Sequence, residues 1–218
     1  MILHSFSFYF NYFKKRYYTK KLNKILNKVE QCSTFFGMPG SGKSTFFAKV
    51  VYLCNRAEKK VYCNCPIKGA ISFDKSDFGR YDFSDSVILI DEGSLYFDGR
   101  NFSTNFNQYS LEYLKLLRHR HNNLLICSQS LDIDIKFIRM SSNIFQIKKG
   151  LFHTSRISLV RRKVDIDEQT HKFEDFYYKL PKFVAFFSDW RVFRPKYYKM
   201  FDSYEAPDLP KMEEKIYE

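Results

Sequence analysis

The sequence predicts an α/β fold in which helices cover both faces of a mainly parallel β-sheet. Three observations predict it. Strand-like and helix-like segments alternate along the chain, two strand-like segments are apolar on both faces, and a glycine-rich loop joins a strand to a helix. Strands that are apolar on both faces are typical of the buried centre of a parallel sheet. With 218 residues the chain can bury a substantial core, and we interpret it as one main domain.

The glycine-rich loop is the most informative segment. It follows a predicted strand at 31–36 and precedes a predicted helix at 44–55. Its sequence fits G-x-x-x-x-G-K-[ST], a pattern of loops whose backbone N–H groups surround a polyphosphate. The predicted nucleotide-binding residues are Gly37, Met38, Pro39, Gly40, Ser41, Gly42, Lys43, Ser44 and Thr45. Loops of this type bind the phosphates of nucleoside triphosphates, and we expect ATP as the ligand.

Two carboxylates complete the predicted site. Asp91 and Glu92 end the apolar strand at 87–91, at the edge where parallel sheets bind ligands. We expect Asp91 and the Ser44 hydroxyl to hold Mg²⁺ from opposite sides, while Lys43 binds the β- and γ-phosphates. Glu92 is the predicted base that polarises the attacking water, which favours hydrolysis over simple binding. Thr45 would contact the α-phosphate, and the whole pattern predicts a P-loop NTPase.

The remaining elements are predicted in chain order. A strand at 60–65 precedes a connection with little regular structure at 67–86, and a polar loop at 93–107 precedes an amphipathic helix at 108–121. A second buried strand follows at 123–129. Three later segments resemble antiparallel edge strands, at 144–148, 157–163 and 183–187. We divide the chain into a basic aromatic segment at 1–30, an ATPase domain at 31–205 and a loosely ordered tail at 206–218.

The composition indicates what kind of partner the protein binds and in which compartment it works. A formal charge of +12 and a pI near 9.4 indicate a polyanionic partner, either nucleic acid or an anionic membrane. An AT-biased genome is an alternative source of the many lysines. Five cysteines, an odd number, indicate a reducing compartment, and the pair Cys63 and Cys65 lacks further metal ligands at suitable spacing.

The first thirteen residues are apolar and aromatic, and Lys14, Lys15 and Arg16 follow them. About 20 residues are needed to cross a bilayer, so we do not predict a membrane span. The segment could instead pack on the domain or on a neighbouring subunit, or lie at a membrane surface with its lysines on anionic lipid.

Several segments together resemble the ATPase domain of the zonular occludens toxin family. That family includes the gene I assembly proteins of filamentous phages and sits within the FtsK–HerA group of DNA-pumping ATPases. The resemblance covers the phosphate loop, Asn64, Asp91–Glu92, and loosely residues 197–205. Its most specific parts are Arg-His-Arg-His at 118–121, the strand end Ser128–Gln129, and the stretch at 131–139.

The resemblance implies further site residues. Gln129 would hydrogen-bond the attacking water or the γ-phosphate and so sense the bound nucleotide. Arg118 or Arg120 could serve as an arginine finger that reaches a neighbouring subunit. For each arginine, a contact to a DNA phosphate or a solvated helix end is an equal alternative.

The function implied is an ATP-hydrolysing motor that translocates DNA, independently of sequence, in virus packaging or export. Implied partners are DNA, a homo-oligomeric ring (a hexamer by resemblance) and capsid, coat or membrane assembly proteins. The implied location is the host cytoplasm, at the inner membrane face or with the virion. Phage members usually carry a membrane-spanning helix after the ATPase domain, which this sequence lacks. Either membrane attachment comes from a partner or the amino-terminal segment, or the protein pumps DNA into a preformed capsid rather than extruding a filament.

Two alternatives stay open from the sequence. A nucleotide or nucleoside kinase also uses a phosphate loop in a small α/β domain, but would need a base pocket and a mobile lid with arginines. A nucleotide-binding adaptor without catalytic activity would bind DNA or membrane and show no turnover.

Overall fold

The structure is a computed structural model. It describes residues 2–74, 77, 81–93, 112–129, 138, 141–166, 173–179 and 190–201. Within these ranges, the backbone alone is described for 2–10, 162–166, 173–177 and 179.

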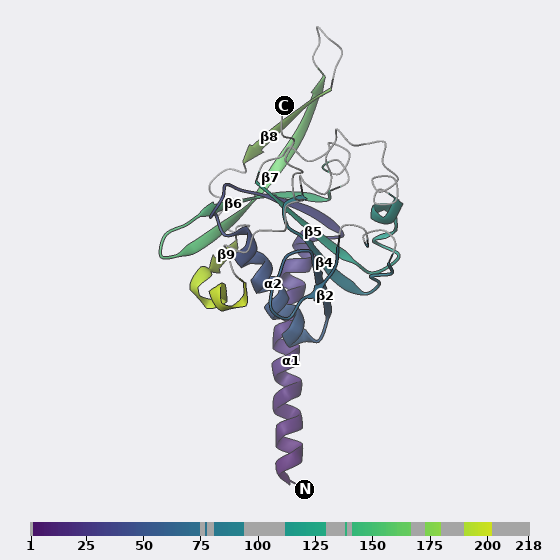
Figure 1. Cartoon of the computed structure of the whole chain (residues 1–218), viewed down its shortest axis with the longest axis vertical. Coiled ribbons are helices and arrows are strands. Elements are labelled where there is room, and N and C mark those ends of the chain that lie inside the picture. The colour runs from purple at the N-terminus through teal and green to yellow at the C-terminus, as the bar shows by residue number, and fades with distance from the viewer. Residues whose placement is uncertain are drawn as a thin grey trace, which may run out of the picture.

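One β-sheet organises the described residues (Figure 1). Its strand order is β3-β2-β4-β5-β1-β6-β7-β8, and β9 pairs with β7. The strands are β1 Cys32–Phe36, β2 Lys60–Cys63, β3 Ile71–Ser72, β4 Ser86–Ile90, β5 Asn123–Ser128, β6 Asn143–Lys149, β7 Thr154–Ile166, β8 Phe173–Lys179 and β9 Trp190–Phe193. Pairings from β3 to β6 are parallel, and those of β7 with β6, β8 and β9 are antiparallel. This arrangement confirms the predicted fold class.

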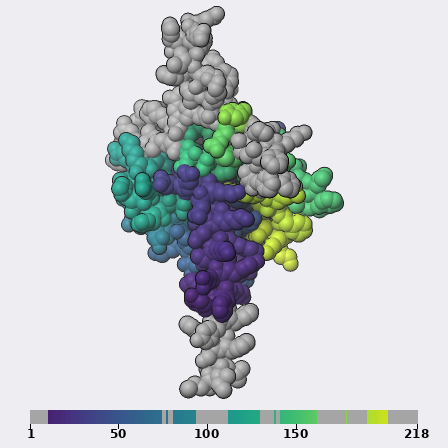
Figure 2. Space-filling view, turned by 180° about the vertical axis from the view of Figure 1, so that it is seen from behind, coloured from purple at the N-terminus to yellow at the C-terminus, as the bar shows by residue number. Residues whose placement is uncertain are grey.

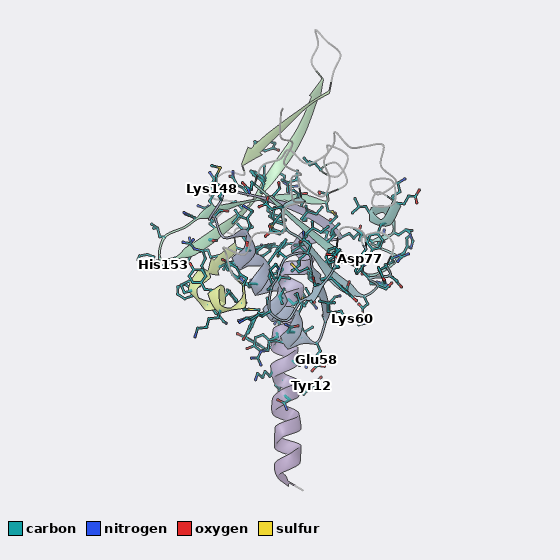
Figure 3. The ribbon with its side chains drawn as sticks, in the orientation of Figure 1. Tyr12, Glu58, Lys60, Asp77, Lys148 and His153 are labelled. Carbon is teal, nitrogen blue, oxygen red and sulfur yellow. The ribbon has the colours of Figure 1, made fainter. Side chains whose placement is uncertain are left out.

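Helix α2, Lys43–Ala57, packs on one face of the sheet together with the end of α1, Ile2–Val29. The buried residues of α1 recur at helical spacing and face α2: Leu22, Ile25, Leu26 and Val29. The first half of α1 extends away from the body (Figure 1). Tyr12, half-exposed at 52%, lies where the helix leaves the body (Figure 3). The last turns of α1 are therefore part of the domain core.

Alternation along the central strands divides the core into two clusters. On the α2 side, the Phe35 ring lies 4.8 Å from the Phe46 ring and 4.9 Å from the Phe145 ring. On the opposite side, Ile88 and Ile90 pack with a second cluster that includes Phe83, Tyr113, Leu117, Leu124 and Ile126. Strands β4 and β5 are thus buried on both faces, as their apolar sequences predict.

Several predicted boundaries differ from the structure. The helix expected at 108–121 is described from 112, is helical to 116 and continues as turns to 121, where His121 has a φ of 54°. Strand β3 lies inside the predicted irregular connection, and β8 and β9 were not predicted. The predicted strand at 183–187 and the tail at 206–218 lie outside the described residues.

The segment Arg194–Met200 forms a short 3₁₀ helix, η2, directly after β9. Among the described helices, none combines the length and the apolar character required to cross a bilayer.

Candidate nucleotide-binding site

The phosphate loop links β1 to α2 and leaves no room for a β-carbon at two of its glycines. At Gly42, where φ is 102°, an added β-carbon would lie 2.1 Å from Ser155 Oγ. At Gly37 it would lie 2.5 Å from the carbonyl oxygen of Ile147. The N–H of Phe46 already donates to the Gly42 carbonyl, at 3.0 Å, so α2 begins at the loop. Its N-terminal N–H groups and dipole therefore favour a phosphate at this point.

The antiparallel part of the sheet braces this loop. The buried Ser155 hydroxyl on β7 donates to the Ser41 carbonyl at 2.6 Å. Arg194, at the start of η2, donates to the Gly40 carbonyl at 3.4 Å and to the His153 carbonyl at 3.3 Å. Segments far along the chain thus hold the outer side of the loop in place.

The loop side chains divide into an inner and an outer group. Ser41, Lys43 and Thr45 are buried, whereas Met38, Pro39 and Gly40 are exposed. The Lys43 ammonium group donates to the Gly37 carbonyl at 2.9 Å, so it lies across the inside of the loop. This is the position from which a lysine can reach the β- and γ-phosphates.

Ser44 and Asp91 meet at the carboxyl edge of the sheet. The Ser44 hydroxyl donates to Asp91 Oδ2 at 3.3 Å, although the two residues belong to different elements. The sequence places Asp91 after β4, and the strand order puts β4 two positions from β1. The structure therefore brings together the two predicted magnesium ligands, as sharing one cation requires.

The charge at Asp91 is poorly compensated. Burial raises the pKa of its carboxyl above the ordinary value, and the neighbouring Glu92 charge raises it further, while Lys43 and Ser44 act in the opposite direction. A divalent cation would offset this excess negative charge, and a hydroxyl with a carboxylate is a donor set suited to Mg²⁺. The residues present thus fit the predicted ion.

Asn64 fixes the backbone of Asp91 from the end of β2. Its side-chain amide donates to the Asp91 carbonyl at 2.9 Å, and its side-chain oxygen accepts from the Asp91 N–H at 2.7 Å. Because both groups of one amide bind one residue, Asn64 sets the position at which β4 ends. The sequence had indicated Asn64 only through the family resemblance, without a role.

Glu92 and Gln129 form the second pair of the site. The Gln129 amide donates to Glu92 Oε1 at 3.0 Å. Gln129 follows β5, which lies between β1 and β4, so the end of its strand is flanked by the strand that leads to the phosphate loop and the strand that leads to the two carboxylates. Glu92 has a φ of 51°, a left-handed value uncommon for a residue with a β-carbon. Both predicted catalytic side chains thus lie at one edge, while their roles stay predictions.

Two buried hydroxyls at this edge need a hydrogen-bond partner. Within the described residues, Ser41 Oγ and Ser128 Oγ are buried without a hydrogen-bond partner. Ser41 lies in the loop and Ser128 ends β5. Phosphate oxygens or water would satisfy such groups.

Cys63 ends β2, and Cys65 lies just after it. Among the described residues, no three His, Cys, Asp or Glu side chains are grouped to hold a metal ion. Strand β2 ends at Cys63, and the Cys63 and Cys65 sulfurs lie 3.1 Å apart as free thiols. The predicted strand was therefore too long, although the two sulfurs do lie together.

Arg118 and Arg120 lie at the other end of the sheet. Both precede β5, whereas Gln129 follows it, and six residues of strand span about 20 Å. Arg120 pairs with Asp82 at 2.9 Å and lies 5.3 Å from the centre of the Tyr113 ring. Neither arginine reaches the nucleotide edge of its own subunit, and a role on a neighbouring subunit stays a prediction.

Sequence reasoning missed Ser155 and Arg194. Both act through carbonyl groups of the phosphate loop, and neither belongs to a recognisable motif. Lys149, at the end of β6, also lies beside the loop. Its ammonium group lies 3.5 Å from the position of a β-carbon built on Gly40.

Comparisons with known proteins give structural similarity only. No protein-family model matches the chain, and no curated protein matches it in sequence. The N-terminal domain of zonular occludens toxin from Neisseria meningitidis aligns with a TM-score of 0.47 and 15% identity, over 78% of this chain and 97% of that one. That toxin domain belongs to the zonular occludens toxin family, which the sequence of this chain resembles.

The genome packaging NTPase B204 from Sulfolobus turreted icosahedral virus 2 is also similar. Its complex with ATP-gammaS aligns with a TM-score of 0.43 and 10% identity, over 68% of this chain and 97% of that one. Its complex with AMPPCP gives a TM-score of 0.43 and 12% identity, over 68% and 96%. Because these scores and identities are low, the fold assignment rests on this chain's own strand order and phosphate loop.

Proposed function

We propose that this protein is a magnesium-dependent ATPase that couples hydrolysis to the movement of DNA during virus or phage assembly. The observation that supports it most directly is the 3.3 Å contact between Ser44 Oγ and Asp91 Oδ2, beside the Glu92–Gln129 pair. The candidate cation ligands, the phosphate loop and the candidate base are therefore close enough to act on one nucleotide.

The residues divide the chemistry among themselves. Lys43 would exchange the Gly37 carbonyl for phosphate oxygens when ATP binds. Ser44 and Asp91 would hold Mg²⁺, which neutralises charge that develops on the β- and γ-phosphates. Glu92 would accept a proton from water as it attacks the γ-phosphate. Gln129, already hydrogen-bonded to Glu92, would orient that water and report whether the γ-phosphate is present.

The coupling to DNA rests on the sequence resemblance and on the charge of +12. In this proposal a ring of identical subunits, six by resemblance, surrounds DNA and contacts its phosphates without reading bases. Arg118 or Arg120 would enter a neighbour's site. The ring works in the host cytoplasm with capsid, coat or membrane assembly proteins, and the exposed Tyr12, Phe13 and Tyr17 of α1 would contact the membrane surface.

Phosphate release, measured with and without DNA, tests this function. We expect Mg²⁺-dependent turnover that DNA stimulates, and loss of turnover in Lys43→Ala, which removes the phosphate contact. A Lys60→Ala variant, changed at an exposed lysine of β2, serves as the matched control. Phosphate transfer to a nucleoside would indicate a kinase instead, and nucleotide binding without turnover would indicate an adaptor.

A further inference from the structure

A charged cavity lies away from the edge of the sheet that carries the predicted nucleotide site. Its volume is about 370 Å³, and it lies between the second half of α1, the middle of α2 and residues 190–197. Figure 2 shows the yellow segment of β9 and η2 next to the purple and blue surface of α1 and α2. None of its lining residues belongs to the phosphate loop or the Asp91 corner. We call this cavity the basic pocket.

The lining of the basic pocket is strongly cationic. Among the described residues that line it there is no Asp or Glu, and six of the twelve are positively charged: Lys21, Lys24, Lys28, Lys49, Arg191 and Lys196. These cations come from α1, α2, β9 and η2, so the fold assembles them from distant parts of the chain. Like charges gathered in one concavity repel each other, and an anion that enters relieves the repulsion.

Lys49 shows this effect most clearly. It is half-buried on α2, and its ammonium group donates to the Arg191 carbonyl at 3.5 Å. Burial lowers the pKa of Lys49, and the charges of Lys21 and Lys196 lower it further. A recessed ammonium group surrounded by other cations is costly without a counter-charge, which indicates that the pocket binds an anion.

Four of the other six lining residues are aromatic, and the remaining two are Ile25 and Leu53. The positions of the rings bear on the kind of anion that the pocket can bind. The aromatic residues are Tyr18, Tyr52, Trp190 and Tyr197. Lys196 lies 4.9 Å from the centre of the Tyr52 ring, and Lys28 lies 5.4 Å from that of Trp190. Combined cations and rings are typical of single-stranded nucleic-acid sites, where lysines bind phosphates and rings stack on bases.

The shape of the charged surface favours a strand over a lipid headgroup. Lys14, Lys21 and Lys28 recur every seven residues, so they lie on one face of α1 and extend the cationic surface beyond the pocket. An elongated polyanion can follow this stripe and also enter the concavity. Lipid headgroups carry phosphate but offer no planar base to the rings.

From this geometry we propose that the basic pocket binds the phosphate backbone of a single-stranded segment of nucleic acid, with bases against its rings. The proposal deepens the DNA-moving function and rests on it for the identity of the cargo. One segment links this pocket to the nucleotide site: Trp190, Arg191, Lys196 and Tyr197 line the pocket, and Arg194, which lies between them in the chain, donates to the Gly40 carbonyl. A bound strand would therefore act directly on the phosphate loop.

Binding of a fluorescein-labelled oligothymidine, followed by anisotropy, tests the pocket. In Lys21→Gln/Lys196→Gln, two exposed cations of the pocket are neutralised, and we expect affinity to fall at least tenfold. Two lost phosphate contacts should also reduce the slope of log K against log salt by about 1.4. The matched control is Lys60→Gln/Lys115→Gln, which removes the same charge at exposed positions outside the pocket. Equal losses in both variants would overturn the proposal.

Two further measurements separate its failure from that of the proposed function. ATP turnover without DNA should be unchanged in the pocket variant, while stimulation by the oligonucleotide should be lost. Should the chain prove unable to hydrolyse ATP while the pocket variant still loses oligonucleotide binding, the pocket assignment stands and the motor does not. Loss of binding to phosphatidylserine vesicles with oligonucleotide binding retained would identify a membrane site and reject the strand.

Discussion

The Gln129 amide donates to Glu92 Oε1 at 3.0 Å, and it does so from the strand between β1 and β4. Glu92 holds this position with a φ of 51°, outside the region that most side chains adopt. A strained backbone persists where the surrounding structure over-determines it, which is common at reacting centres. The relationship predicts that the two side chains act together on one water molecule.

Glu92→Gln should keep ATP binding and lose hydrolysis. The amide retains the size of the side chain but cannot accept the proton of the attacking water, so turnover should fall at least about 100-fold. Phosphate release and equilibrium binding of a fluorescent ATP analogue measure the two properties separately. Loss of nucleotide binding in this variant would contradict the role of Glu92 as a base.

Gly42→Ala should destabilise the domain more than Gly40→Ala does. Both glycines have positive φ, 102° and 69°, and a β-carbon in that region costs about 1–2 kcal/mol. At Gly42 the β-carbon would also overlap Ser155 Oγ, whereas at Gly40 the nearest atom is a flexible lysine end 3.5 Å away. Urea unfolding of both variants without nucleotide measures the difference. Equal losses of unfolding free energy in the two variants would show that Ser155 on β7 does not exclude a side chain at Gly42.

Asp91→Asn should change the pH dependence of stability in a defined direction. The pKa of Asp91 is raised in the folded chain, so the folded state retains its proton to higher pH than the unfolded state does. The wild-type free energy of unfolding should therefore fall, relative to Asp91→Asn, as pH rises from the ordinary Asp value through the raised one.

Urea unfolding in nucleotide-free buffer from about pH 4 to pH 7 measures this difference, and other titrating groups cancel between the two proteins. Adding Mg²⁺ with ATP at neutral pH should stabilise the wild type and have a much smaller effect on Asp91→Asn. If the free energies of unfolding of the two proteins changed in parallel with pH, folding would not raise the pKa of the Asp91 carboxyl.

Asn64→Ala should reduce catalysis while leaving nucleotide binding mostly intact. The substitution removes both hydrogen bonds to the Asp91 backbone and should cost about 1–3 kcal/mol of stability. The end of β4 would then shift, so the concentration of Mg²⁺ needed for half-maximal turnover should increase. If Asn64 had a purely structural role, Asn64→Ala would lower stability and leave the magnesium dependence of turnover unchanged. In Asn64→Gln, we expect that neither hydrogen bond to the Asp91 backbone is fully restored.

Local patterns explain what the sequence could predict. The loop at 37–44 and the apolar strand before Asp91 are encoded by neighbouring residues, so both could be placed without knowledge of the sheet. The buried strand before Gln129 was predictable for the same reason. The adjacency of Gln129 and Glu92 depends on the strand order, whereas the family resemblance implied only that Gln129 belongs to the site.

Contacts between distant segments explain what was missed. Ser155 and Arg194 reach the loop through antiparallel pairing of β7 with β6 and β9, and no local pattern specifies that pairing. The helix expected to continue to 121 ends earlier because residues 117–121 turn into β5, with Asn122 buried and hydrogen-bonded to Tyr113. Apolar periodicity alone does not reveal such a turn.

The hydrogen bond from Ser155 to Ser41 also bears on how the chain matures during synthesis. The two residues are 114 positions apart, so the ribosome makes the loop first and its brace, at roughly 5–20 residues per second, some 6–23 seconds later. A nascent chain that has released β1 and α2 from the exit tunnel still lacks the residues that fix the loop's carbonyls. We therefore expect nucleotide affinity to emerge only after β7 has left the exit tunnel and paired with the loop.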